Sequence, residues 1–337
     1  MAATFPDNQT WLDQVDEAVV DPERPIVDPH HHFWHNRRVG EYLLKDLRLD
    51  TDSGHRIEKT VFLECGAEYR SSGAKHLAVV GESEFVAGIA AESRESSGAE
   101  VAAIVGSCDL RATAVLDEVL AAHQEASRGL FRGIRHSGAR DDNKGVLMIP
   151  GQAPEGLYSD DSFRSGVKRL GEQGFSYDTW HYHHQNADFY TLACAVPDTV
   201  MVLDHFGTPL GVGPYAEQRE SIFKQWKIDV ARIAECPNVH AKLGGLAMPD
   251  NGFGWHLADR PPTSDEFIEL QHPYYQHMID CFGPERCMFE SNFPVDRFSV
   301  SYKVLWNAFK KMTAGYSEDE KHALFYGTAV RVYRLDN

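Results

Sequence analysis

Histidines stand at the ends of apolar runs in this chain, where their side chains could do chemistry. The run Pro25–His32 ends in Asp-Pro-His-His-His, and because side chains alternate along a strand, His30 and His32 share one face while His31 takes the other. Two imidazoles about 7 Å apart on one face can share a metal ion or one oxyanion. The alternative is a surface cluster, or buried histidines that bond to the backbone.

Two further apolar runs end in ionisable residues. The run Thr199–His205 closes with an Asp-His pair, so His205 is a catalytic or ligand candidate, with a simple strand-end pair as the alternative. The run Arg286–Asn292 places Glu290 and Asn292 on one face. A carboxylate in a core is costly unless it is paired or functional, so Glu290 is a candidate base, acid or ligand, with an ion pair as the alternative.

Other polar residues at strand ends are candidates for holding a substrate. Arg135 could bind a substrate carboxylate with two parallel hydrogen bonds, although a structural ion pair explains it equally well. Glu64 and Lys242 stand at similar positions and carry the same two interpretations. Trp180 and His183 follow a fifth apolar run and could line the entrance of a site, with some of these residues serving as walls rather than reactants.

Eight short apolar runs could position these side chains, and such runs are typical of parallel strands buried on both faces. The expected strands are Pro25–His32, Ile57–Cys65, Val101–Ser107, Phe131–His136, Phe175–Trp180, Thr199–His205, Asn238–Leu243 and Arg286–Asn292. Helical patterns lie between them, with capping boxes at Thr263–Glu266 and Ser317–Glu320 and helical candidates in Ala112–Ser127, Gln218–Cys236 and Ser299–Thr313.

This alternation predicts one closed (β/α)₈ TIM barrel, an α/β fold whose catalytic residues lie at the carboxyl ends of the strands. An open doubly wound sheet is the alternative, but no Gly-x-Gly-x-x-Gly follows the first strand and no phosphate-binding P-loop occurs. We expect residues 1–24 to form an N-terminal extension and residues 25–337 to form the barrel. Three long segments rich in Gly and Pro (137–159, 207–216 and 244–262) predict binding loops after strands.

Composition excludes several classes of protein. The 337 residues include 33 Lys and Arg against 50 Asp and Glu, a formal net charge of −17, which argues against nucleic-acid and anionic-membrane partners. The six cysteines form no Cys-x-x-Cys pair, the N-terminus has no signal-peptide pattern, and no apolar run could span a membrane. We expect a cytoplasmic protein that acts on a small molecule, with a homo-oligomer as an open question.

Six motifs in barrel order give the chain a family resemblance. They are Asp28-Pro-His-His-His-Phe-Trp34, Gly133-Ile-Arg135, Phe175-Ser-Tyr-Asp178 with Trp180-x-Tyr-His-x-Gln185, Leu203-Asp-His-Phe-Gly207, Lys242-Leu-Gly-Gly-Leu246 and Met288-Phe-Glu-Ser-Asn-Phe-Pro294. Together they resemble the amidohydrolase-2 branch of the amidohydrolase superfamily, and within it the sugar-lactone and 2-pyrone-4,6-dicarboxylate lactone hydrolases. The resemblance covers nearly the whole chain.

The resemblance implies roles for the motif residues. It implies a (β/α)₈ barrel in which His30, His32 and His205 polarise a lactone carbonyl or bind a divalent metal, and in which Arg135 contacts substrate carboxylate or hydroxyl groups. Some members use zinc or another divalent ion such as manganese, and some lactonases need none, so both states stay open. The implied activity is a hydrolase that opens a lactone or related cyclic ester.

One position departs from the family pattern. The resemblance implies an Asp at the end of the eighth strand that activates water, but the chain has Asn292 there, and an amide does not accept a proton near neutral pH. Glu290, two residues earlier on the same face, could replace this base, with Asn292 orienting the water; His183 or a metal-bound hydroxide are alternatives. A metal-dependent decarboxylase of the same branch and a non-catalytic barrel are the alternative functions.

Overall fold

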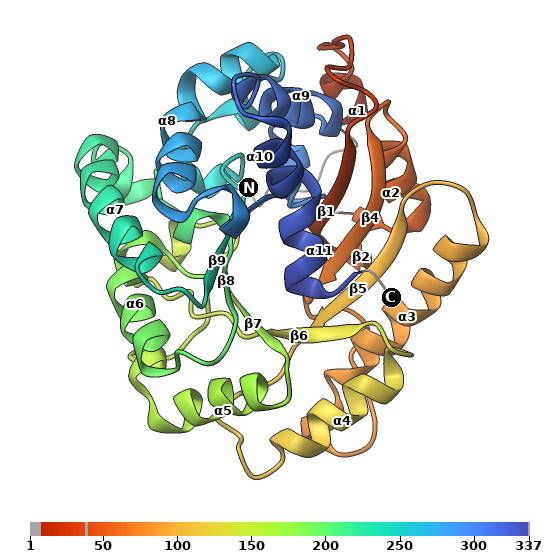
Figure 1. Ribbon diagram of the computed structural model, residues 1–337, viewed down its shortest axis with the longest axis vertical. Coiled ribbons are helices and arrows are strands. Elements are labelled where there is room, and N and C mark those ends of the chain that lie inside the picture. The colour runs from red at the N-terminus through yellow and green to blue at the C-terminus, as the bar shows by residue number, and fades with distance from the viewer. Residues whose placement is uncertain (1–7, 38–39, 336–337) are drawn as a thin grey trace.

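Eight parallel strands form a ring at the centre of the computed structural model, which describes residues 8–37 and 40–335 (Figure 1). The ring follows the order β1 (Pro25–His31), β4 (Arg56–Leu63), β5 (Glu100–Gly106), β6 (Phe131–Arg135), β7 (Ser176–Thr179), β8 (Met201–Leu203), β9 (Val239–Leu243) and β10 (Cys287–Phe289). All eight expected strands are therefore confirmed, and the fold is the predicted (β/α)₈ barrel.

The first and last strands are joined by contacts just beyond their regular hydrogen bonds. The backbone N–H of His32 donates to the carbonyl of Phe293 at 2.9 Å, and the N–H of Asn292 donates to the carbonyl of His30 at 3.0 Å. The closure thus brings the histidine motif of the first strand directly against the Glu290–Asn292 motif of the last. A two-stranded hairpin, β2 (Trp34–Arg37) and β3 (Gly40–Tyr42), follows β1.

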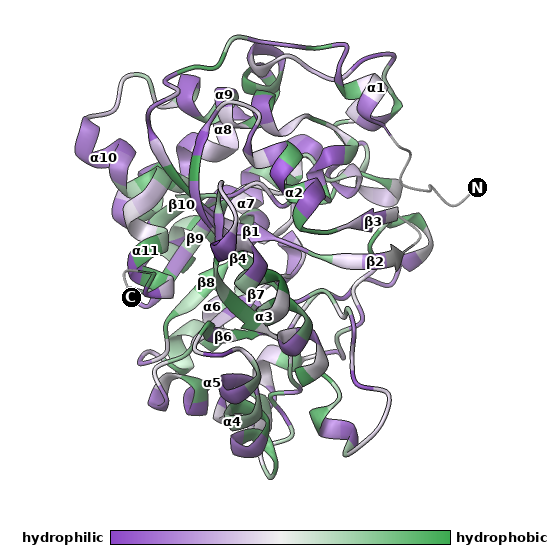
Figure 2. Cartoon of the chain, turned by 90° about the vertical axis from the view of Figure 1, so that its right-hand side faces the viewer, coloured by the Kyte–Doolittle hydropathy of each residue, from purple (hydrophilic) through white to green (hydrophobic). Residues whose placement is uncertain are grey.

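Helices surround the ring, as Figure 1 shows. In the described residues they are α1 (Gln9–Leu12), α2 (Leu44–Thr51), α3 (Val80–Glu95), α4 (Leu116–Ala126), α5 (Asp161–Glu172), α6 (Asn186–Ala195), α7 (Arg219–Ala234), α8 (Ser264–Phe282), α9 (Tyr302–Met312), α10 (Glu318–His322) and α11 (Thr328–Tyr333). The two capping boxes are confirmed at the starts of α8 and α10. Figure 2 shows hydrophobic residues concentrated on the strands and a strongly hydrophilic α10.

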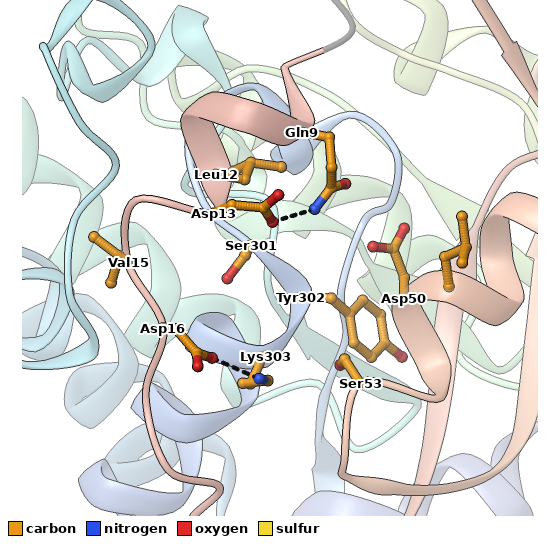
Figure 3. Close-up of a pocket in the computed structure, with 11 residues that line it drawn as sticks. Gln9, Leu12, Asp13, Val15, Asp16, Asp50, Ser53, Ser301, Tyr302 and Lys303 are labelled. Atoms are coloured by element: carbon orange, nitrogen blue, oxygen red, sulfur yellow. Dashed lines mark hydrogen bonds and ion pairs between the residues drawn. The ribbon is translucent and has the colours of Figure 1, made fainter.

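The N-terminal segment lies against the outside of the barrel. Between α1, α2 and α9 it borders a groove of about 580 Å³ (Figure 3). The Asp16 carboxylate accepts a hydrogen bond from Lys303 Nζ at 2.7 Å, and Asn307 Nδ2 donates to Glu17 at 3.0 Å. Buried Asn307 also accepts from the backbone N–H of Val20 at 2.8 Å. The extension is therefore fastened to α9 by polar contacts.

The three long loops are tied together by one buried carboxylate. Asp250 accepts hydrogen bonds from the backbone N–H groups of Met148 and Ile149 at 2.7 and 3.1 Å. Its own backbone carbonyl accepts from the N–H of Gly211 at 2.9 Å. Loops that follow three different strands thus share one anchor above the carboxyl ends. In the described part of the chain, no helix is both long and apolar enough to cross a membrane.

Candidate functional site

Glu290 lies at the centre of the site and holds two imidazoles. It is fully buried; its Oε1 accepts from His205 Nδ1 at 2.6 Å and its Oε2 lies 2.7 Å from His30 Nδ1. The hydrogen bond fixes the proton of His205 on Nδ1, and the short contact to the carboxylate favours the same tautomer for His30. A carboxylate that fixes the tautomer in this way is typical of metal-binding and proton-transferring histidines.

The backbone around these residues leaves room for the contact. His205 and the next residue, Phe206, have φ angles of +53° and +61°, so the chain turns sharply as soon as β8 ends. Gly245 packs against the His205 ring and Gly244 against the Glu290 side chain, and a Cβ atom at either glycine would collide with them. The Gly-Gly pair after β9 is thus required for the histidine and the glutamate to meet.

His32 completes a pair with His30, as the strand alternation predicts. His32 Nδ1 lies 2.9 Å from the carbonyl oxygen of Leu63, so this nitrogen carries the proton and donates. The Nε2 atoms of His30 and His32 then face each other at 3.3 Å, each with a lone pair. Two facing lone pairs repel each other unless a cation or a proton lies between them. His31 packs on the other face against Phe33.

Arg135 and Glu64 form one wall of the site. Arg135 Nε donates to Glu64 Oε1 at 2.9 Å, and Nη2 donates to the Glu64 backbone carbonyl. Arg135 Nη1 also lies 3.2 Å from His30 Nε2 and 3.5 Å from Asp204 Oδ2. Arg135 is 7% exposed, so little of its side chain remains for a substrate to contact.

Lys242 lies beneath the histidines, not at the entrance. Its Nζ is 3.1 Å from both Asp178 Oδ2 and Asp204 Oδ1 and 3.4 Å from His30 Nδ1. The side chain is completely buried, and the two carboxylates raise its pKa although burial opposes them. Lys242 therefore acts on the site through its neighbours, and the expected direct contact with substrate is not what this geometry favours.

Asn292 is held by a second carboxylate. It has a φ of +56°, and its Nδ2 donates to Asp296 Oδ1 at 2.8 Å. Asp296 Oδ2 accepts from the backbone N–H of Ala247 at 3.3 Å. Burial raises the pKa of Asp296 to about 7, although His205 and Asn292 lower it. The Asn292 side chain is thereby held in one orientation, and its Oδ1 stays available to accept a hydrogen bond.

Trp180 and His183 lie in the loop after β7 and contact the turn after β8. Trp180 Nε1 donates to Thr208 Oγ1 at 3.0 Å, and His183 Nδ1 accepts from the N–H of Leu210 at 3.2 Å. His183 Nε2 is therefore the protonated nitrogen, and burial lowers the pKa of this ring to about 4. Trp180 and His183 are both partly exposed, as expected for residues that line the entrance to the site.

The electrostatics separate the histidines into two kinds. Burial, and then the charge of Lys242, holds the pKa of His30 well below its usual range; burial and Arg135 do the same for His32. Burial also acts on His205, but the Glu290 carboxylate outweighs it and raises the pKa of that ring. His30 and His32 are thus neutral, while His205 is the more basic imidazole.

The residues present fit a divalent cation. The potential ligand atoms of His30, Asp204 and His205 lie within 4.8 Å of one another. The 3.3 Å between the Nε2 atoms of His30 and His32 also matches two ligands of a tetrahedral ion with bonds of about 2.0 Å. In their ordinary ionised forms the connected groups carry two positive and four negative charges: Arg135, Lys242, Glu64, Asp178, Asp204 and Glu290.

These six groups sum to −2, which one divalent ion would balance; a protonated His205, whose pKa Glu290 raises, would balance one of the two charges. Arg135, which already approaches His30 Nε2, is the alternative cation at that position. The expected ligands His30, His32 and His205 thus lie together, with Asp204 as a further ligand that sequence reasoning had considered only as the partner in an Asp-His pair. Asp178 contacts Lys242 of β9, and Asp296 contacts Asn292 in its own loop and Ala247 after β9; these partners follow from the fold and not from the local sequence.

The fold and the site define a (β/α)₈ barrel with a buried histidine–carboxylate centre. The sequence matches the family described as Amidohydrolase over residues 27–335, and the chain belongs to this family. The Sinorhizobium fredii protein y4mH is 32% identical over 335 residues, which cover 92% of this chain and 98% of that protein. An L-fucono-1,5-lactonase from Burkholderia multivorans is 26% identical over 322 residues, 92% of this chain and 96% of the lactonase.

A solved structure has the same fold. A Burkholderia multivorans amidohydrolase with bound zinc superposes with a TM-score of 0.72 at 23% identity, covering 93% of this chain and all of the other. The family resemblance drawn from six motifs is therefore confirmed.

Proposed function

We propose that the protein hydrolyses a lactone or related cyclic ester of a small carboxylated or hydroxylated compound. The observation that carries the proposal is the double contact of Glu290 with His30 and His205, which leaves Nε2 as the nitrogen of His205 that can take a proton, with the His30 ring 4.4 Å away between ring centroids. The likeness to an L-fucono-1,5-lactonase supports the substrate class. Such a site can activate water and polarise a carbonyl within a few ångströms of each other.

In this mechanism His205 takes the proton from the attacking water. Its Nδ1–H donates to Glu290 Oε1 at 2.6 Å, so the imidazolium that forms at Nε2 is stabilised by the buried carboxylate. Glu290 thus supplies the base function together with His205 rather than by contacting water itself, because both its oxygens already face histidines. Asn292 orients the water through the amide oxygen that Asp296 leaves free.

The carbonyl oxygen of the substrate lies on the side of His30 and His32 in this proposal. Arg135 stabilises the negative charge that develops there or holds a polar substituent, and Glu64 accepts a hydrogen bond from a substrate hydroxyl. Trp180 and His183 form the outer wall. A divalent ion, zinc or manganese, held by His30 and His32 with Asp204 nearby would polarise the same carbonyl.

The test is a pH-indicator screen of aldonolactones, muconolactones and pyrone carboxylates, with metal analysis of the purified protein. We expect acid release from at least one lactone. Activity that a chelator removes and Zn²⁺ or Mn²⁺ restores would place an ion on the histidines, whereas full activity without metal would leave Arg135 as the working cation. Release of CO₂ from a carboxylated substrate, or no turnover of any compound, would overturn the lactonase proposal in favour of a decarboxylase or a binding protein.

A further inference from the structure

A second cavity, of about 430 Å³, opens at the amino end of the barrel, away from the histidines. It is bordered by early residues of β4, β5 and β6 and by the residues that follow α11. Five of its ten lining residues are cations: Lys59, Arg94, Arg128, Arg132 and Arg334. Such a concentration is unexpected in a chain whose formal net charge is −17.

The positive charge in this cavity is not neutralised by the described residues. Glu100 is the lone carboxylate among the lining residues, and it pairs with Arg94 at 3.0 Å. The other four cations form no ion pair with any carboxylate in residues 8–37 and 40–335. The local charge of the lining groups is therefore +4, from five cations and one anion.

The cations contact backbone carbonyls instead. Arg132 Nε donates to the Tyr333 carbonyl at 2.6 Å and its Nη1 to the Gly129 carbonyl at 2.7 Å. Lys59 Nζ donates to the carbonyl of Leu335. These bonds fix the side chains but leave their charges uncompensated, and burial together with Arg334 lowers the pKa of Arg132. The guanidinium Nη2 of Arg132 has no partner among the described residues.

We infer that this cavity binds a compact, multiply charged anion such as a phosphate-bearing or dicarboxylate small molecule. Converging cations compensate two or more negative charges, and arginine forks match the oxygens of phosphate and carboxylate groups. The volume suits a small ligand. The inference is independent of the proposed hydrolysis, because the cavity lies at the opposite ends of the strands from Glu290 and shares no residue with that site.

The test measures binding of inorganic phosphate and of succinate by titration calorimetry at low ionic strength. We expect the native protein to bind one of them with millimolar affinity or better, and the Arg128→Gln, Arg334→Gln double variant to bind it at least about tenfold more weakly. Both residues are exposed, and the Arg128 side chain makes no hydrogen bond in the described residues, so we expect the single R128Q variant to keep the fold and to serve as the milder test. Whichever probe binds identifies the ligand class.

Two matched variants distinguish this cavity from other cationic sites. Arg169 is an exposed arginine that pairs with Asp117 on the outer surface. The Arg169→Gln variant should bind the probe as tightly as the native protein. Arg135→Gln examines the other cationic site: binding that belongs to the histidine site is lost in this variant, and binding that belongs to the amino-end cavity is retained. Loss of binding in R135Q but not in R128Q/R334Q, equal loss in R169Q, or no binding of either probe by the native protein would overturn the inference.

Discussion

The two ends of the barrel handle positive charge in opposite ways. At the carboxyl end the two buried cations face carboxylates: Lys242 contacts Asp178 and Asp204, and Arg135 contacts Glu64. At the amino end Lys59, Arg132 and Arg334 contact backbone carbonyl oxygens instead. Strand β6 carries both Arg132 and Arg135, three residues apart. The same strands thus present paired charges at one end and uncompensated positive charges at the other, and only the first group includes histidines in contact with a carboxylate.

The largest expected effect comes from breaking the network at its centre. Glu290→Gln keeps the shape but removes the charge and the control of the His30 and His205 tautomers. We expect kcat on the lactone found by the screen to fall by about 10² to 10⁴-fold with the fold intact. Steady-state kinetics beside the exposed Glu285→Gln as a control would measure it; a change below about threefold would remove Glu290 from the mechanism.

A second change breaks the charge balance beneath the histidines. Lys242→Met leaves Asp178 and Asp204 buried without their shared cation. We expect a loss of about 3–5 kcal/mol in the free energy of unfolding, as is usual when one partner of a buried ion pair is removed. Urea unfolding compared with the exposed Lys168→Met would show it. Equal stability of the two variants would mean that Lys242, Asp178 and Asp204 do not carry the charges assigned to them here.

A third change tests the histidine near the amino end of β9, His240. Burial, with Arg331 and Arg286, lowers the pKa of His240 on β9 to about 4. Because the folded value lies below the unfolded value of about 6.5, the unfolded state binds the proton first and stability is lost as the pH falls from 6.5 to 4. His240→Thr should reduce this loss by about 1–3 kcal/mol, measured by urea unfolding at pH 7 and pH 4.5. An unchanged pH dependence would contradict it.

The smallest effect concerns Tyr333, which contacts polar residues of both ends of the barrel. Tyr333 OH donates to Asp178 Oδ2 at 2.5 Å, while the Tyr333 carbonyl accepts from Arg132. Tyr333→Phe removes the hydroxyl alone and should cost about 1–2 kcal/mol of unfolding free energy. We also expect a small drop in kcat, because Asp178 supports Lys242. Thermal unfolding and kinetics together measure both, and the exposed Tyr69 provides a Tyr→Phe control.

The sequence predicts the carboxyl end of this barrel far better than its amino end. Apolar runs identify all eight strands because parallel strands buried on both faces need them, and strand direction alone then places His30, His205 and Glu290 together. The ion pairs of Lys242 cannot be predicted from the apolar runs, since they depend on the register between neighbouring strands. The link from Asn292 to Asp296 depends on a left-handed turn that no sequence pattern announces.

The position of Tyr333 has a practical consequence for handling the protein. This side chain is completely buried among residues of the barrel interior and lies against Lys242, whose Nζ is 5.4 Å from the ring centroid. A chain shortened before Tyr333 would keep all eight strands and every histidine of the site. It would, however, lose the side chain that covers Lys242 on the side away from the histidines. Helix α11 therefore closes the barrel interior at this end, and purification tags are better placed at the N-terminus.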